Sequence, residues 1–212
     1  MHPIRILLAD DHEVVRAGYR RLLENSTGIE VITEVASGED AYSRYCDLHP
    51  DVVVMDLTMP GMGGLEASRR IIAHDSRAKI LVFSVHENEV MLNRALDAGV
   101  LGYISKRSAS AVMIEAVRRV AAGEVYVGQE MMSFLVKRTT TPDSDLVVGL
   151  SPREFEVFRL LADSKSVNEI AELLNLSPKT VGHHMTSIKS KLHIDNVAGL
   201  TRLAIRLGII TP

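Results

Sequence analysis

The first half of the chain alternates between short apolar runs and longer stretches of mixed polarity. The runs have the length of strands, and two of them, VVVM and ILVF, are apolar without alternation. Continuous apolar runs are typical of strands covered on both faces, as in a parallel sheet. The pattern therefore predicts a doubly wound α/β domain with a five-stranded parallel sheet. The expected strands are 4–9, 29–35, 52–55, 80–84 and 102–105, and the expected helices are 13–24, 38–47, 64–74, 87–98 and 110–122.

Periodicity is lost beyond the fifth expected helix. Polar turn formers gather in KRTTTPDSDLVVG, as is typical of a linker. The neighbouring EMMSFLVK is apolar at helical spacing and predicts a short helix within it. We expect three parts: a first domain over 1–122, a linker over 123–149 and a second domain over 150–212.

The last part predicts an all-α domain of four helices. Two Ser-Pro pairs each place an N-cap before a first-turn proline, so helices should begin at 152 and 178. The short amphipathic helix between them ends near Asn175, and its tight connection has helix-turn-helix spacing. Residues 177–192 contain three lysines, two histidines and no acidic residue. An ordinary surface helix fits that composition as well, but the preceding helices favour DNA binding.

Composition narrows the class of protein. A length of 212 residues, 46% of them hydrophobic, is enough for two domains with separate cores. The apolar stretches are far shorter than the roughly 20 residues needed to span a bilayer, and no secretion signal is visible, so we expect a cytoplasmic protein. Cys46 is the single cysteine, which excludes an internal disulfide, and we interpret it as a small buried hydrophobe rather than a redox group.

The formal net charge of −3 hides an uneven distribution, because the first part is acidic and residues 150–212 are slightly basic. This asymmetry is a weak indication that the last part meets a polyanion.

Polar groups follow four of the five expected strands. Two adjacent carboxylates, Asp10 and Asp11, follow the first strand, and Asp56 follows the third. The fourth strand ends at Ser84 and the fifth is followed by Lys106. Ligands of parallel sheets bind beyond the carboxyl ends of the strands. Oxygen ligands without cysteine or paired histidines describe a hard cation such as Mg²⁺.

These residues resemble the receiver domain of two-component response regulators, which the segments MDLTMPGMGGLE and GYISK support. The resemblance implies the flavodoxin-like strand order 2-1-3-4-5 and a cognate sensor histidine kinase as partner. It implies that Asp56 is the phosphorylated residue, and that Mg²⁺ is held by Asp10, Asp11, Asp56 and the backbone carbonyl of Thr58.

The same resemblance assigns a switch around the phosphate. Ser84 and Lys106 would bind the phosphoryl group, and Tyr103 would turn inward, although from the residues alone it is equally an ordinary half-buried tyrosine. Thr58 and His86 occupy positions that modulate the lifetime of the phosphoryl group. His12 could be taken for a metal ligand, but a helix cap or a solvated side chain suits an oxygen-rich site better.

The second domain resembles the LuxR-type helix-turn-helix of the NarL/FixJ family through LSPRE, VNEIAELLNLSPKTV and IKSKL. The motifs VRAG, MPGMGGLEA and SVNEI are nearest to the GacA/UvrY subgroup. In related domains the recognition helix enters the major groove of double-stranded DNA. Gly182, which replaces a longer polar residue common in relatives, would face the bases. The other residues expected at DNA are His183 and Thr186 at the bases, Lys179, Thr180, Lys189 and Lys191 at the phosphates, and His184 at either.

The last expected helix, about 196–207, has more apolar residues than one stripe requires. Pairing through this helix would bring two recognition helices to the half-sites of a promoter, and a homodimer is the family's solution. Core packing alone is the alternative. The residues expected at the dimer interface are Val197, Leu200, Leu203 and Ala204.

The sequence therefore predicts a two-component response regulator that binds DNA under the control of Asp56 phosphorylation. We expect no enzyme activity beyond transfer of its own phosphoryl group and its hydrolysis. A haloacid-dehalogenase phosphohydrolase would need a second aspartate where Thr58 stands. A phosphorylation-independent DNA binder would not need the five polar residues at the strand ends.

Overall fold

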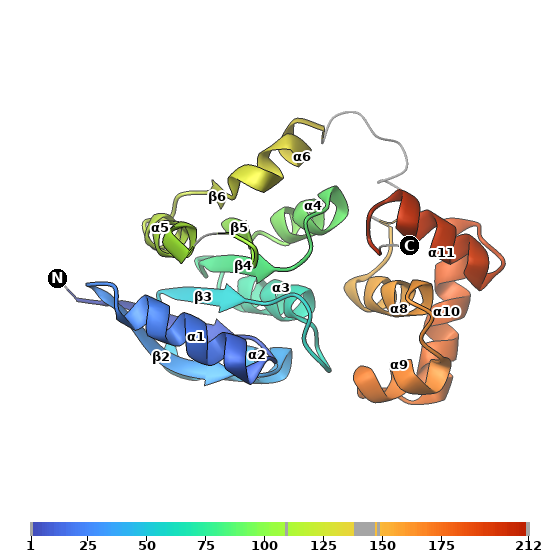
Figure 1. Cartoon of the computed structure of the whole chain (residues 1–212). Coiled ribbons are helices and arrows are strands. Elements are labelled where there is room, and N and C mark those ends of the chain that lie inside the picture. The colour runs from blue at the N-terminus through green and yellow to red at the C-terminus, as the bar shows by residue number, and fades with distance from the viewer. Residues whose placement is uncertain (1, 109, 138–146, 148, 211–212) are drawn as a thin grey trace. The chain divides into compact units, whose positions relative to one another are not determined.

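The computed structural model describes residues 2–108, 110–137, 147 and 149–210. The chain divides into two compact units, one made of residues 1–87 and 95–133 and the other of residues 88–94 and 134–212. The predicted domain limits at 122 and 149 stay predictions. Figure 1 shows the order of the elements along the chain.

The first unit is built on a six-stranded parallel sheet in the order β2-β1-β3-β4-β5-β6. The five predicted strands and their order are confirmed. The additional strand, β6, has only two residues, too few for a periodic signal in the sequence. The strands are β1 (Ile4–Ala9), β2 (Ile29–Val35), β3 (Val52–Met55), β4 (Ile80–Ser84), β5 (Gly102–Ser105) and β6 (Tyr126–Val127).

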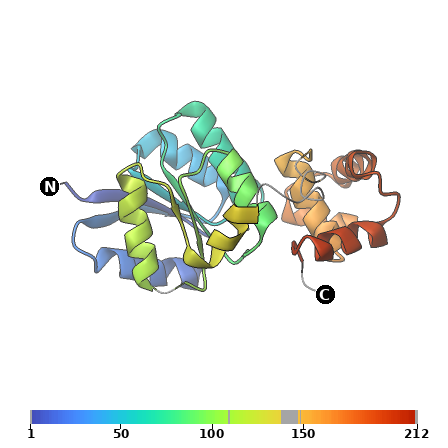
Figure 2. The same ribbon diagram turned by 90° about the horizontal axis from the view of Figure 1, so that it is seen from above.

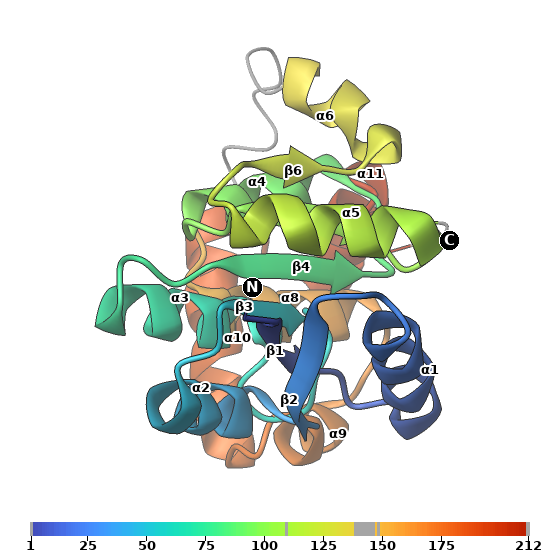
Figure 3. The same ribbon diagram turned by 90° about the vertical axis from the view of Figure 1, so that its left-hand side faces the viewer.

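Helices cover both faces of this sheet, as the apolar strands require. Figures 2 and 3 show α1 and α5 on one face and α2 and α3 on the other. Every residue of β3 and β4 is buried between these layers. The helices are α1 (Glu13–Glu24), α2 (Gly38–Leu48), α3 (Gly64–His74), α4 (Glu89–Asp97) and α5 (Ser110–Ala121).

The core on the α1 and α5 side joins helix to sheet through large side chains. The rings of Tyr19 and Phe83 meet edge to face, with centroids 4.4 Å apart. Leu23 from α1 and Met113 and Val117 from α5 are fully buried in the same cluster. This packing holds the strands in place, and with them the polar residues at the strand ends.

A glycine allows α3 to begin close to the end of β3. A Cβ atom added to Gly64 would lie 1.8 Å from the backbone oxygen of Asp56. At the same helix start, the backbone N of Gly64 donates a hydrogen bond to Leu57 O at 3.2 Å. The loop that follows Asp56 is thereby held against the strand end.

Residues 126–137 lie in the segment that the sequence predicted as a linker. After β6 come a 3₁₀ turn, η1 (Gln129–Met131), and the short helix α6 (Met132–Lys137), which confirms the predicted helix. β6 pairs with β5, so that Gly102 lies opposite Tyr126 and Tyr103 opposite Val127. The start of the segment is therefore part of the sheet. Residues 138–146 and 148 lie outside the described residues.

In the second unit, four helices follow residue 150, as predicted. They are α8 (Pro152–Ala162), α9 (Val167–Leu173), α10 (Pro178–Leu192) and α11 (Val197–Arg206). The predicted starts at 152 and 178 are confirmed. Ser151, Ser166 and Ser177 each accept a hydrogen bond from a first-turn backbone amide, so each caps its helix. The buried residues Phe155, Phe158, Ile170, Val181, Ile188, Leu192 and Leu200 form the core.

We predict that Gly64→Ala lowers the free energy of unfolding by about 1–3 kcal/mol, as overpacking does, because the methyl group meets the backbone of Asp56. Urea unfolding monitored by circular dichroism measures the change. The control is Gly18→Ala. Gly18 is an exposed residue of α1, and a Cβ built on it meets nothing within 4 Å. This substitution should stabilise the chain by up to about 1 kcal/mol, since alanine favours helix. If the two substitutions changed the free energy of unfolding equally, the close contact between Gly64 and the backbone of Asp56 would not be what makes alanine costly there.

Candidate functional site

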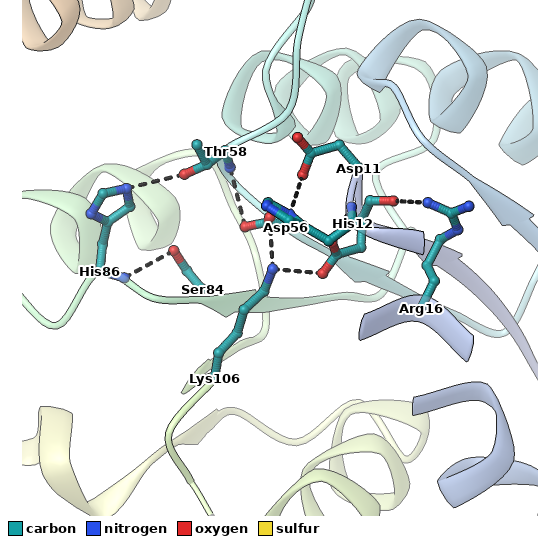
Figure 4. A network of polar contacts seen from close by, with 9 residues as sticks. Asp11, His12, Arg16, Asp56, Thr58, Ser84, His86 and Lys106 are labelled. Carbon is teal, nitrogen blue, oxygen red and sulfur yellow. Dashed lines mark hydrogen bonds and ion pairs between the residues drawn. The ribbon is translucent and has the colours of Figure 1, made fainter. Parts of the chain in front are cut away.

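Four polar side chains from four neighbouring strand ends meet at one edge of the first unit. Lys106, which follows β5, places Nζ 2.5 Å from Asp10 Oδ2 and 2.8 Å from Asp56 Oδ2. Ser84 closes β4, the strand between β3 and β5. Figure 4 shows the lysine directed at Asp56, with Ser84 beside its stem. The structure thus brings together the residues that the sequence placed at the strand ends.

The site is buried and has an excess of negative charge. Asp10 and Asp56 are each only 2% exposed, and one ammonium group lies between them. Burial raises the pKa of Asp56, and the attraction of Lys106 offsets only part of that effect. Burial alone would lower the pKa of Lys106, but the two carboxylates outweigh it and raise the pKa above its usual value. A further cation would relieve the remaining repulsion.

The donor set fits a hard divalent cation. Ligand atoms of Asp10, Asp11, His12 and Asp56 lie within 4.8 Å of one another. Asp11 Oδ1 is buried, and its close polar neighbour among the described residues is the ring Nδ1 of His12, at 2.8 Å. Carboxylates grouped this closely repel one another unless a cation lies among them. Carboxylate oxygens such as those of Asp10, Asp11 and Asp56 are the ligands that Mg²⁺ prefers.

His12 stands at the edge of this group. Its side chain is 65% exposed, and Nδ1 lies 2.8 Å from Asp11 Oδ1 and 3.5 Å from Asp10 Oδ1. It occupies the N-cap position of α1, but its side chain makes no capping hydrogen bond. Its backbone N donates to Asp10 Oδ1 at 2.8 Å, which helps to orient that carboxylate.

Arg16 supports the acidic pair in a way that the sequence did not predict. One of its guanidinium nitrogens donates to the backbone oxygen of Asp10 at 2.6 Å. Its Nε lies 3.7 Å from Glu34 Oε2 at the end of β2. The spacing of six residues between Arg16 and Asp10 gives no signal, because Asp10 lies in the turn after β1 and Arg16 lies in α1, so no single periodic element contains both.

The predicted switch residues lie on β4 and β5. Ser84 is fully buried, and its Oγ accepts a hydrogen bond from His86 N at 3.2 Å. Tyr103 is also fully buried, and its hydroxyl donates to His86 O at 2.7 Å. Burial raises the pKa of Tyr103. The structure shows Tyr103 directed inward; its proposed motion stays a prediction.

Thr58 and His86 meet beside the carboxylate of Asp56. Thr58 Oγ1 lies 3.1 Å from His86 Nε2, a hydrogen bond whose direction depends on the tautomer. Thr58 N donates to Asp56 Oδ1 at 3.1 Å. The loops after β3 and β4 are thus joined by a contact that Figure 4 shows next to Asp56.

In the second unit, α10 presents a polar face of mixed exposure. Lys179, His183, Thr186 and Lys191 are exposed, whereas the four other residues expected at DNA are half-buried: Thr180, Gly182, His184 and Lys189. Burial lowers the pKa of His184. No atom lies within 4 Å of a Cβ built on Gly182, so this position is open.

A buried carboxylate on α8 holds the middle and end of α10. Glu154 is 6% exposed, and its two carboxylate oxygens accept hydrogen bonds from Ser187 Oγ and Lys191 Nζ, each at 2.6 Å. Its Oε2 also accepts from Ser151 N at 2.7 Å as part of a capping box. The capping box is visible in LSPRE, but nothing in the sequence links Glu154 to Lys191. The ammonium of Lys191 is therefore engaged within the protein.

The residues expected at a dimer interface divide into two groups. Leu200, Leu203 and Ala204 are at most 3% exposed, so the alternative of core packing describes them. Their burial leaves no surface for a partner. The exposed large apolar residues of α11 are Val197, at 39%, and Ile205, at 37%.

Two family models match this chain. The response regulator receiver domain matches residues 6–118, and the bacterial regulatory proteins of the luxR family match residues 148–204. The chain belongs to the two-component response regulators whose second part is a LuxR-type DNA-binding domain, and these are transcription regulators.

Relatives along nearly the whole chain agree with the predicted subgroup. The response regulator UvrY of Escherichia coli strain K12 is 40% identical, covering 97% of this chain and 95% of its own. The response regulator GacA of Pseudomonas protegens is 36% identical, covering 98% of each chain.

A solved structure of a response regulator has a similar fold along nearly the whole chain. RcsB from Salmonella enterica serovar Typhimurium, bound to promoter P1flhDC with the phosphomimetic BeF3⁻, has a TM-score of 0.68 and 28% identity. The match covers 95% of this chain and 98% of RcsB. Among the described residues, none of the helices has the length and apolar character needed to cross a bilayer.

We predict that Glu154→Gln lowers the free energy of unfolding by about 1.5–3 kcal/mol at pH 7, the value of hydrogen bonds to a charged group. Burial alone would raise the pKa of Glu154, but hydrogen bonds from Lys191, Ser187 and Ser151 lower it to about 2 from the ordinary 4.5. The stabilisation is therefore complete above pH 4.5 and is lost as the pH falls towards 2.

Urea unfolding of both chains at a series of pH values measures this effect. The difference between wild type and Glu154→Gln should shrink as the solution becomes more acidic than pH 4.5. Glu172→Gln, at an exposed position of α9, is the control and should leave stability unchanged. A difference that does not vary with pH would disprove the role of the charge.

Proposed function

We propose that a sensor histidine kinase phosphorylates Asp56 in a Mg²⁺-dependent reaction, and that this controls dimerisation and sequence-specific DNA binding. The observation that carries the proposal is the ammonium of Lys106 lying between Asp10 and Asp56 at the sheet edge. A regulator of the luxR family acts on DNA, so the proposed location is the cytoplasm.

In the proposed reaction an oxygen of Asp56 attacks the phosphorus of a phosphohistidine. The new P–O bond forms as the P–N bond breaks, and the imidazole leaves with the electron pair. Mg²⁺, held by Asp10, Asp11, Asp56 and the carbonyl of Thr58, would neutralise charge on the phosphoryl oxygens. Lys106 Nζ already contacts Asp56 Oδ2. It can therefore also donate a hydrogen bond to an oxygen of a phosphoryl group attached to Asp56.

Hydrolysis reverses the signal. Water attacks phosphorus, the P–O bond to Asp56 breaks, and inorganic phosphate leaves. The hydrogen-bonded pair of Thr58 and His86 lies beside the Asp56 carboxylate. The pair therefore stands where it can limit the approach of that water, which supports the expected influence of both residues on the phosphoryl lifetime.

DNA binding is proposed for the exposed face of α10. Lys179, His183 and Thr186 are exposed there, with the open position Gly182 on the same helix. Positive side chains supply affinity for phosphates, and the residues facing the groove supply sequence preference. The RcsB relative bound to promoter DNA supports this use of the domain.

Dimerisation is proposed through the exposed apolar residues of α11 rather than through its buried ones. Val197 and Ile205 are eight residues apart in α11, so they lie about 80° apart around the helix axis and within one broad apolar stripe. A dimer would present two recognition helices to two half-sites of the promoter.

We predict that Asp56→Asn abolishes phosphorylation by phosphoramidate with Mg²⁺, because an amide cannot form the acyl phosphate. Phosphate-affinity gel electrophoresis measures the labelled fraction, and EDTA should abolish labelling of the wild type. Operator affinity of the variant, on DNA selected in vitro with the phosphorylated wild type, should not respond to the phosphodonor.

Asp47→Asn, at an exposed position of α2, is the matched control and should be labelled like the wild type. If the wild type is not labelled, or if labelling leaves both dimerisation and DNA affinity unchanged, the chain is a phosphorylation-independent DNA binder instead.

A second prediction concerns α11. Val197→Asp combined with Ile205→Asp should raise the dimer dissociation constant of the phosphorylated chain roughly ten-fold or more, because both charges would enter an apolar contact. Sedimentation velocity measures this. Leu173→Asp, at a 43% exposed apolar position of α9, is the control. If Leu173→Asp weakened the dimer and the double substitution in α11 did not, the interface would lie elsewhere than on α11.

A further inference from the structure

Glu130 lies outside the receiver match, which ends at residue 118, yet its carboxylate reaches the loop that contains Lys106. Glu130 Oε1 accepts a hydrogen bond from Ser105 N at 3.3 Å and another from Ser108 Oγ. Ser105 and Ser108 stand on either side of Lys106 in the chain. One carboxylate oxygen therefore bridges the loop around the lysine that contacts Asp56.

The position of Glu130 is fixed by its own segment. Tyr126 N donates to Leu101 O and Gly128 N donates to Tyr103 O, each at 2.9 Å, so the backbone before Glu130 is bonded to β5 and the residue before it. Met131, which follows Glu130, is fully buried. The side chain of Glu130 is thus held next to the loop by anchors on both sides.

Gly128 leaves room for the carboxylate to fold back. A Cβ built at this position would lie 2.8 Å from Glu130 Oε1. Burial alone would raise the pKa of Glu130, but hydrogen bonds from Ser108 Oγ and from the backbone amides of Glu130 and Ser105 outweigh it and lower the pKa below its usual value.

The loop has further restraints on the side of β4. Lys106 N donates to Ser84 O at 2.8 Å, and the hydroxyl of Ser105 donates to Glu87. Glu87 and Glu130 therefore hold the loop from two different segments, one after β4 and one after β6. The reach of Lys106 to Asp56 depends on the backbone between these two carboxylates.

We propose that Glu130 is a positioning residue for phosphoryl transfer, because it holds the loop that places the Lys106 ammonium at Asp56. This inference rests on the proposed phosphorylation of Asp56. It extends the functional receiver through β6 and η1, beyond the predicted limit at residue 122.

The test is the rate of phosphorylation of the full-length chain by phosphoramidate. Glu130→Ala should lower the rate constant at saturating Mg²⁺ by roughly 5- to 100-fold, since a misplacement of about 1 Å can cost up to 100-fold. The half-saturating Mg²⁺ concentration should stay within about two-fold, because Lys106 is not among the expected metal ligands. A purely structural defect would change both.

Glu130→Gln distinguishes loop geometry from charge. Its amide oxygen can still accept from Ser105 N and Ser108 Oγ, so this variant should recover at least about half of the wild-type rate. Glu124→Ala is the matched control in the same segment. Glu124 is exposed and pairs with Arg119 on α5, and its loss should leave the rate unchanged.

Three outcomes would overturn the inference while leaving the proposed function intact. They are an unchanged rate in Glu130→Ala, an equally slow Glu130→Gln, and a slow Glu130→Ala whose half-saturating Mg²⁺ concentration and melting temperature shift as well. A wild type that is not labelled on Asp56 would instead overturn the proposed function, and this inference with it.

Discussion

The first unit depends on one arrangement of charge: two buried carboxylates, Asp10 and Asp56, share a single ammonium at the edge of a parallel sheet. Burying unequal numbers of opposite charges is costly, and it is tolerated where a ligand can complete the balance. The sheet makes this possible because parallel strands end at the same edge. Apolar packing below, as in the contact of Tyr19 with Phe83, keeps that edge in place. Stability in the core and reactivity at the rim are therefore separated along each strand.

Much of this could be predicted from the sequence. The five longer strands, their order and the starts of α8 and α10 follow from apolar runs and N-cap signals, which are local. Asp10, Asp56, Ser84 and Lys106 could be grouped because each ends or directly follows a strand. Contacts between residues far apart in the chain could not. Arg16 on Asp10, Glu154 on Lys191 and Glu130 on Ser105 join polar residues whose spacing has no period.

The prediction for α11 shows a limit of reading apolar periodicity from the sequence. Apolar periodicity identified more apolar positions than one stripe requires, but it could not say whether Leu200, Leu203 and Ala204 meet the protein's own core or a second copy. Their burial assigns them to the core, and Val197 and Ile205 are the exposed large apolar residues of this helix. A similar ambiguity concerns α10, where lysine alone does not reveal whether its charge meets DNA or an internal partner.

The pairing of Lys191 with Glu154 has a consequence for how ionic strength acts on this protein. Each lysine that neutralises a DNA phosphate releases condensed counterions, and this sets the slope of the logarithm of affinity against the logarithm of salt concentration, about −0.9 per contact. An ammonium already paired with a carboxylate of its own domain, as Lys191 is with Glu154, releases fewer. In the proposed complex with DNA, Lys179 and Lys189 would then set the electrostatic contribution of α10. The dependence on salt would be shallower, and more of the discrimination between promoters would be left to contacts with the bases.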